Sequence, residues 1–233
     1  MNRHPMSRRR RPEDNAQIRT RPPGTLYRVV RAMVGPVARL LWPTTIEGSQ
    51  YVAESGPAII AANHVSFFDS IALNLAVHRR IGFVGKAEYL DNWKTRRLFP
   101  ALGMIPLERD SGRQALRALA AAAKVVDSGD LFAIYPEGTR SRDGKLHPGH
   151  RGVGHLAVAT GAPVIPAGIT GTDKVQPAGA RVPRPFHRIV VRFGTPIDPA
   201  NFDGAKHDRH RRITEEVMTA IQQLSGQELA TAR

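Results

Sequence analysis

The sequence predicts an α/β domain with a largely parallel sheet flanked by helices. Short apolar runs rich in Ile, Val and Ala recur along the chain and are bounded by turn residues, which is the pattern of buried strands. Stretches of helical period separate most consecutive runs, and parallel strands require such crossovers. With 233 residues, the chain can form one sizeable domain but not two generous ones.

In chain order, strands are predicted at residues 58–62, 81–85, 103–107, 131–135, 163–169 and 188–193. Helices are predicted at residues 69–78, 94–101, 112–127, 151–160 and 208–224. The helix at 112–127 has the clearest signal, because it is alanine-rich and periodic and Gly129 marks its end. The segment 172–187 contains several prolines and arginines and is predicted to be an irregular, basic surface loop. The main domain is predicted to span residues 45–233.

Residues 1–24 are predicted to be a disordered basic tail. Residues 1–22 contain seven arginines against Glu13 and Asp14, with few apolar side chains. The whole chain has a formal net charge of +14, which calls for an anionic partner, either a nucleic acid or an anionic membrane surface.

Residues 25–44 are predicted to form an amphipathic helical segment, with Pro36 indicating a kink. Its apolar residues recur at helical spacing and its arginines fall opposite them: Leu26, Val29, Val30, Met33, Val34, Val37, Leu40 and Leu41 against Arg28, Arg31 and Arg39. This pattern suits a helix lying in a bilayer interface with Trp42 as an interfacial anchor, but it suits a helix packed on its own core equally well. No stretch reaches the roughly twenty apolar residues of a spanning helix, and a signal peptide is not expected.

The composition narrows the chemistry. The chain has no cysteine, which excludes disulfides, thiolate nucleophiles and cysteine zinc sites and fits a reducing cytosolic setting. His147, His150 and His155 cluster in the sequence but match no metal motif, so no metal is expected. Aromatic residues make up 6% and no stacking platform is recognisable, so nucleic-acid binding is a distant alternative.

The most informative segment is Asn63-His64-Val65-Ser66-Phe67-Phe68-Asp69, which joins a predicted strand to a predicted helix. A histidine at a strand exit and a carboxylate five residues later can fold back into a hydrogen-bonded pair. The carboxylate then holds one ring nitrogen as a donor and leaves the other free to accept a proton. Alone, the spacing is compatible with a capped turn as well as with a general base.

Three more segments favour the general base: Gly103-Met-Ile-Pro-Leu-Glu-Arg109, Tyr135-Pro-Glu-Gly-Thr-Arg-Ser141 and Ala162-Pro-Val-Ile-Pro-Ala-Gly168. These four blocks, in this order and at these separations, resemble the glycerolipid acyltransferase family. The resemblance covers residues 45 to 200 or so, most of the chain. The main domain at 45–233 is therefore expected to be an acyltransferase domain.

The resemblance implies that His64 deprotonates a glycerol hydroxyl and that Asp69 orients it. The hydroxyl then attacks an acyl thioester directly, without an acyl-enzyme. In agreement, Ser66 lacks the Gly-x-Ser-x-Gly context of a serine nucleophile. Asn63 is expected to support the loop or the oxyanion, with Ser66 beside it.

The resemblance also implies a site for the acceptor phosphate. Its expected members are Lys86, Arg109, Glu137, Gly138, Thr139 and Arg140. Gly138 permits close backbone approach and Arg140 offers two donors to a phosphate. Glu137 is expected to orient Arg140 or the loop. For Lys86 and Arg109 taken singly, a solvated charge at a strand end is the simpler interpretation. Val164, Ile165 and Pro166 are expected to be structural.

The function implied is transfer of a fatty acyl chain from acyl-CoA or acyl-carrier protein to 1-acyl-sn-glycerol-3-phosphate, giving phosphatidic acid. No cofactor is expected beyond the acyl donor, and the location implied is the cytoplasmic face of the cell membrane. Val65 stands where many bacterial members carry glutamine, and Phe67-Phe68 is bulkier than usual. These departures leave a different lipid acceptor, a glycolipid or a lyso-ornithine lipid, as an alternative.

Overall fold

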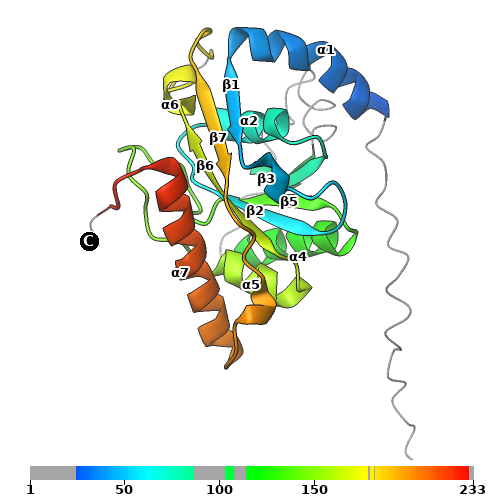
Figure 1. Ribbon diagram of the computed structural model, residues 1–233, viewed down its shortest axis with the longest axis vertical. Helices are drawn as coiled ribbons and strands as arrows, with labels where there is room; N and C mark the ends of the chain where they lie inside the picture. The colour runs from blue at the N-terminus through cyan, green and yellow to red at the C-terminus, as the bar shows by residue number, and fades with distance from the viewer. Residues whose placement is uncertain (1–24, 87–102, 108–113, 178, 181, 231–233) are drawn as a thin grey trace, which may run out of the picture.

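The computed structural model describes residues 25–86, 103–107, 114–177, 179–180 and 182–230, without the side chains of residues 25–31, 86, 106, 107 and 114. A seven-stranded sheet runs through the molecule with helices on both faces (Figure 1). The predicted tail at 1–24, the predicted helix at 94–101 and Arg109 all lie outside the described residues.

The sheet is mostly parallel, as predicted. Its strand order is β1 (Thr44–Glu47), β7 (Ile189–Phe193), β6 (Val164–Thr170), β2 (Ala58–Ala62), β5 (Leu131–Ile134), β3 (Ile81–Lys86) and β4 (Met104–Leu107). The five strands β6, β2, β5, β3 and β4 are parallel to one another. Strand β7 runs antiparallel to β6, and β1 is parallel to β7.

The two faces of the sheet carry separate apolar cores. One lies against α2 (Phe68–Ala76) and α6 (Thr172–Val175), and the other against α4 (Gln114–Asp127), α5 (Gly152–Thr160) and α7 (Lys206–Ser225). Single 3-10 turns lie at Ser49–Tyr51 and Pro199–Asn201. Strand β2 alternates between the cores, because Ile60 packs in the first and Ile59 in the second. All five residues of β2 are buried, so the segment that begins at Asn63 is held in place at its start.

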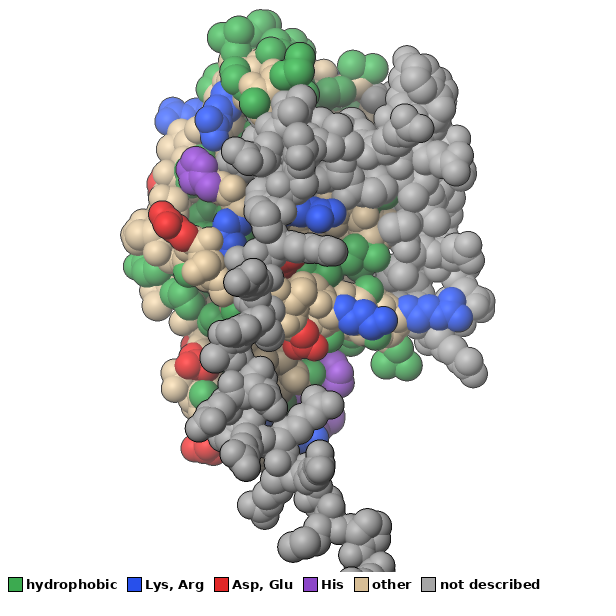
Figure 2. Space-filling model, turned by 90° about the vertical axis from the view of Figure 1, so that its right-hand side faces the viewer, with side chains coloured by type: hydrophobic (Ala, Val, Ile, Leu, Met, Phe, Trp, Pro, Cys, Tyr) green, Lys and Arg blue, Asp and Glu red, His purple; other side chains and the backbone are tan. Residues whose placement is uncertain are grey.

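The helix α1 (Thr25–Leu41) lies across one end of the molecule (Figure 1). Four of its described large apolar side chains point outward: Met33 is 71% exposed, Val34 55%, Val37 55% and Leu40 73%. The small residues Gly35 and Ala38 are buried instead. Figure 2 shows hydrophobic side chains gathered at this end. Among the described residues, none of the helices combines the length and the hydrophobicity needed to cross a bilayer.

Of the two placements left open for residues 25–44, the contacts of Trp42 agree with packing on the protein. Rather than facing a bilayer as a free anchor, its ring packs on Phe68 with the centroids 4.7 Å apart, and its indole N–H donates to the Arg184 carbonyl at 2.8 Å. Arg39 also donates to the Leu75 carbonyl at 3.2 Å. These contacts tether the C-terminal end of α1 to α2 and to the loop before β7.

Candidate active site

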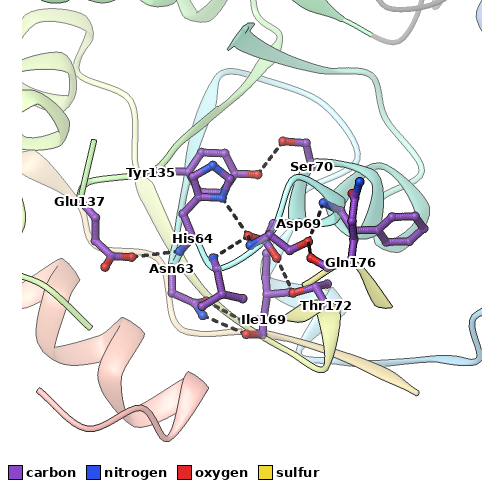
Figure 3. A network of polar contacts seen from close by, with 12 residues as sticks. Asn63, His64, Asp69, Ser70, Tyr135, Glu137, Ile169, Thr172 and Gln176 are labelled. Carbon is purple, nitrogen blue, oxygen red and sulfur yellow. Dashed lines mark hydrogen bonds and ion pairs between the residues drawn. The ribbon is translucent and has the colours of Figure 1, made fainter. Parts of the chain in front are cut away.

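His64 and Asp69 are brought together as predicted. His64 lies two residues beyond the buried strand β2, and its Nδ1 is 2.8 Å from Asp69 Oδ2 (Figure 3). The Asp69 side chain is fully buried at the start of α2, while the His64 side chain is 18% exposed. The imidazole Nε2 forms no hydrogen bond with the described residues. The ring therefore keeps one nitrogen without a hydrogen bond to the described residues.

Asp69 is surrounded by hydrogen-bond donors. Its Oδ2 also accepts from the backbone N–H groups of Val65 and Ser66, each at 2.8 Å. Its Oδ1 accepts from the Thr172 hydroxyl at 2.5 Å. A buried carboxylate with donors on both oxygens is stabilised as an anion and as an acceptor. Asp69 therefore favours the His64 tautomer that carries its proton on Nδ1 and keeps Nε2 as the acceptor.

Tyr135 packs against one face of the imidazole ring. Its ring stacks on that of His64, with centroids 3.9 Å apart and planes 13° from parallel. The Tyr135 hydroxyl is 2.8 Å from the Ser70 hydroxyl. Burial, and then the nearby negative charge of Asp69, raise the pKa of Tyr135, so the phenol stays neutral. The stacking on Tyr135 and the hydrogen bond to Asp69 together fix the orientation of the imidazole ring, and with it the position of Nε2.

Glu137 clamps two loops together. Its Oε1 accepts the His64 N–H and its Oε2 accepts the His147 N–H, each at 3.0 Å. The Ser141 N–H donates to the His64 carbonyl at 2.7 Å, so the turn after β5 grips His64 on both sides. Burial raises the pKa of Glu137, and the two backbone donors partly offset this. Of the two roles expected for Glu137, the structure shows support of the loop. With both oxygens occupied by amides, Glu137 does not orient Arg140.

Asn63 and Ser66 have structural roles. The Asn63 side chain donates to the Ile169 carbonyl at 2.9 Å and accepts from the Ile169 N–H at 2.7 Å, which ties the loop to β6. The Ser66 hydroxyl donates to the Gln176 carbonyl at 3.0 Å and accepts from the Phe68 N–H. Of the two roles expected for Asn63, support of the loop is the one that its contacts show, because both ends of its amide bond to the backbone of β6 rather than facing an oxyanion.

The expected phosphate-binding residues are only partly gathered. Gly138, Thr139 and Arg140 are exposed on the turn after β5, and Arg140 pairs with none of the described residues. Gly138 has φ of 70°, and a Cβ there would lie 3.0 Å from the His150 ring. Lys86 ends β3, but its side chain lies outside the description. Within the described residues, no three histidines or carboxylates are grouped as metal ligands would be.

Thr172 and the stacking of Tyr135 were not foreseen from the sequence. Thr172 lies about a hundred positions beyond Asp69 and carries no local motif. Tyr135 belongs to a block that was identified, but nothing in its sequence context indicates that its ring lies against His64. Both contacts depend on the side-by-side placement of β2 with β5 and with β6.

Comparison with known proteins places this geometry in a family. The acyltransferase family model matches residues 43–170. A chloroplast 1-acyl-sn-glycerol-3-phosphate acyltransferase of Brassica napus is 31% identical over 76% of this chain and 51% of the relative. An enzyme of the same name from Limnanthes douglasii is 31% identical over 75% of this chain and 62% of the relative. The chain thus spans about half to three-fifths of the length of these relatives.

A solved structure agrees with the sequence relatives. The crystal structure of the 1-acyl-sn-glycerophosphate (LPA) acyltransferase PlsC from Thermotoga maritima matches with a TM-score of 0.66 and 29% identity. The match covers 85% of this chain and 79% of that one. Taken with the family model, which covers more than half of the sequence and includes His64, Asp69 and the turn after β5, this likeness leads to one conclusion: the chain belongs to the acyltransferase family.

Proposed function

We propose that this protein transfers a fatty acyl group from a thioester, acyl-CoA or acyl-carrier protein, to the free hydroxyl of 1-acyl-sn-glycerol-3-phosphate, forming phosphatidic acid. The observation that carries the proposal is the His64–Asp69 pair, in which Asp69 holds Nδ1 and Nε2 has no hydrogen bond to the described residues. The names of the relatives support the choice of acceptor.

In the proposed reaction, His64 Nε2 takes the proton of the acceptor hydroxyl as its oxygen attacks the thioester carbonyl. A C–O bond forms and the carbonyl oxygen becomes an oxyanion. When this intermediate collapses, the C–S bond breaks and the imidazolium returns the proton to the leaving thiolate. Asp69 stabilises the transient imidazolium by its fixed negative charge.

The side-chain contacts support direct transfer rather than an acyl-enzyme. Ser66 is the hydroxyl nearest to His64 in the sequence, and it donates its proton to the Gln176 carbonyl rather than to the imidazole. An activated serine nucleophile needs its hydroxyl within reach of the base. The chain has no cysteine to take that role.

The acceptor phosphate is assigned to the turn after β5. Arg140 is exposed, without a partner among the described residues, and can give two parallel hydrogen bonds to phosphate. Gly138 has a positive φ and no side chain, so a ligand can approach its backbone closely. Lys86 and Arg109 complete the proposed site on the strength of the family resemblance alone.

Membrane association is assigned to α1 and the basic tail, on the cytoplasmic face of the membrane. The outward apolar row of α1 supports this part of the proposal, because several large apolar side chains exposed on one helix are typical of an interfacial helix. Acceptor and product are both lipids, so an enzyme resting on the bilayer meets them where they reside.

The test is a panel of acceptors assayed with palmitoyl-CoA, oleoyl-CoA and the matching acyl-carrier proteins, with the products read by mass spectrometry. We expect lysophosphatidic acid to be preferred and His64→Ala to be inactive. We expect Arg140→Ala to raise the KM for lysophosphatidic acid more than the KM for the donor, because the arginine binds a group remote from the reacting oxygen. Equal use of a phosphate-free glycolipid or lyso-ornithine lipid by wild type and Arg140→Ala would overturn the choice of acceptor.

A further inference from the structure

Phe186, in the loop before β7, has an unusual backbone conformation. Among the described residues it is the one non-glycine residue with positive φ, at 65°. A bulky aromatic residue is disfavoured in this region and stays there only when its surroundings hold it. Its side chain is nevertheless 74% exposed, and Val182 in the same loop is also 74% exposed. The strained backbone therefore does not bury the Phe186 side chain.

The loop is held by the end of α1. The Phe186 N–H donates to the Leu41 carbonyl at 2.6 Å, and the Trp42 indole donates to the Arg184 carbonyl at 2.8 Å. The Arg184 N–H in turn donates to the Val175 carbonyl at 2.7 Å. Carbonyls in the last turn of a helix have no partner within the helix, so Phe186 satisfies one of them. Its strained backbone is thus part of the attachment between the loop and α1.

This attachment joins two exposed apolar groups into one surface, which we call the apolar platform. It consists of the outward row of α1 and the two loop residues: Met33, Val34, Val37, Leu40, Val182 and Phe186. Helix α1 lies at the end of the molecule where Figure 2 shows hydrophobic side chains gathered, and the loop is bonded to the last residue of this helix. Exposed apolar surface concentrated in this way marks a site of interaction.

The charges around the platform indicate its partner. Neither residues 15–46 nor residues 174–197 contain an acidic side chain, although both stretches contain several arginines. Arg39, Arg184 and Arg188 are exposed in these two segments. Two copies of such a surface would repel one another, whereas an anionic bilayer offers both apolar chains and phosphate groups.

We propose that the loop 182–186 is a second bilayer-inserting element, with Phe186 and Val182 entering the interface beside α1 and Arg184 and Arg188 binding anionic headgroups. The inference rests on the membrane association proposed above and adds an element to it. The loop reaches the catalytic segment through Arg184, whose carbonyl accepts from Trp42, and Trp42 packs on Phe68. Arg184 also donates to Val175, and the next residue, Gln176, accepts from the Ser66 hydroxyl.

The test replaces Phe186 with asparagine, which tolerates positive φ and removes the apolar ring. Binding to vesicles of phosphatidylglycerol and phosphatidylcholine is measured by sedimentation at about 1 M salt, where the Debye length is about 3 Å and charge attraction is screened. We expect binding to fall by roughly tenfold or more, the effect of leaving one large apolar side chain in water. The melting temperature should stay the same or rise, since strain is relieved.

Leu116→Asn is the matched control, because Leu116 is 66% exposed on α4 and lies outside the platform; its vesicle binding should equal that of wild type. Val182→Asn repeats the test without touching the strained position. Wild-type binding by both loop variants would overturn the inference. So would a loss of self-association in sedimentation velocity with vesicle binding unchanged, because the partner would then be a second copy.

Acyl transfer to a water-soluble short-chain acceptor, without vesicles, separates this inference from the proposed function. We expect Phe186→Asn to match wild type there. If wild type itself fails on every glycerophosphate acceptor, the proposed reaction is wrong. The vesicle result still decides whether the loop enters a bilayer.

Discussion

At the scale of single residues, Asp69 and His64 differ in what their removal should do. His64 is partly exposed and makes one side-chain hydrogen bond among the described residues, so His64→Ala should leave the fold intact. We expect it to lower acyl transfer by roughly 10²–10⁴-fold, as loss of one positioned general base does. Thioester turnover with a chromogenic thiol reagent measures the activity, and circular dichroism monitors the fold.

Asp69→Asn should impair activity and stability together. Asp69 is buried and accepts four hydrogen bonds. In Asp69→Asn one of the two oxygens becomes an N–H₂ group, which is a donor and faces other donors without an acceptor. Unmet buried polar groups cost about 1–3 kcal/mol each. Urea unfolding should therefore show Asp69→Asn destabilised and His64→Ala nearly unchanged. The reverse order would contradict the described network.

Glu137 should make stability depend on pH in a direction opposite to that of an ordinary ion-paired carboxylate. Its pKa lies above the usual 4.5, chiefly because of burial. The folded state then holds the proton more tightly than the unfolded state, so this contribution is complete below pH 4.5 and is lost as pH rises through the raised pKa. Urea unfolding across this window should show that slope in wild type but not in Glu137→Gln.

Asp143→Asn provides a control of opposite sign. The pKa of Asp143 lies below its usual 3.8, first because His147 hydrogen-bonds to it, then because of the Lys145 N–H and the Ser141 hydroxyl. Its contribution is present above pH 3.8 and is lost as pH falls further. If the free energy of unfolding depended on pH in the same way in Glu137→Gln and in Asp143→Asn, neither carboxyl would have the environment described.

Sequence reasoning at this scale succeeded where contacts are local. His64 and Asp69 are five positions apart and fold back within one loop, so their spacing carries the signal. Thr172, the Tyr135 stack and the amides that Glu137 accepts are distant in sequence, and each depends on which strands become neighbours. A hydroxyl or a ring gives no sign of such a partner in its own neighbourhood.

At the scale of elements, α1 offers a prediction about salt-resistant binding. Replacing Val34, Val37 and Leu40 with serine should abolish vesicle binding that persists at about 1 M salt, because that part depends on buried apolar area. Leu40 is chosen over Leu41, which is only half-exposed. The fold should survive, because all three side chains point away from the body. Unfolding of the variant in a thermal melt would show instead that this face packs on protein.

Elements were predicted well where apolar period and length were both present. The helices α2, α4, α5 and α7 and the strands β2, β3, β5 and β6 lie within two residues of expectation. The short helix α6 was missed, because Thr172–Val175 falls in the segment predicted to be an irregular loop. The strand β1 was missed because Thr44–Glu47 is short and has little apolar character. The antiparallel direction of β7 was also missed, because the preceding irregular segment does not reveal whether the chain reverses before it returns to the sheet.

At the scale of the whole molecule, the net charge of +14 predicts salt-sensitive attraction to anionic surfaces. Removing residues 1–22 takes away seven arginines and should weaken vesicle binding at low salt, on the order of 1 kcal/mol for each basic residue near the surface. At high salt the truncated and full chains should bind alike. A titration of vesicles at two ionic strengths measures both. Equal binding at low salt would show that the charge lies too far from the bilayer to act.

The pairing of β1 with β7 has a consequence for biosynthesis. Thr44 pairs with Ile189, and the Leu41 carbonyl at the end of α1 accepts from Phe186, so these two contacts of the N-terminal elements wait for β7 and for the loop before it. On the ribosome, α1 and β1 emerge first and wait until nearly the whole domain has been made. Contacts so remote along the chain form late and slowly. A nascent chain arrested before β7 should therefore expose α1 to protease, and release of the full chain should bring protection.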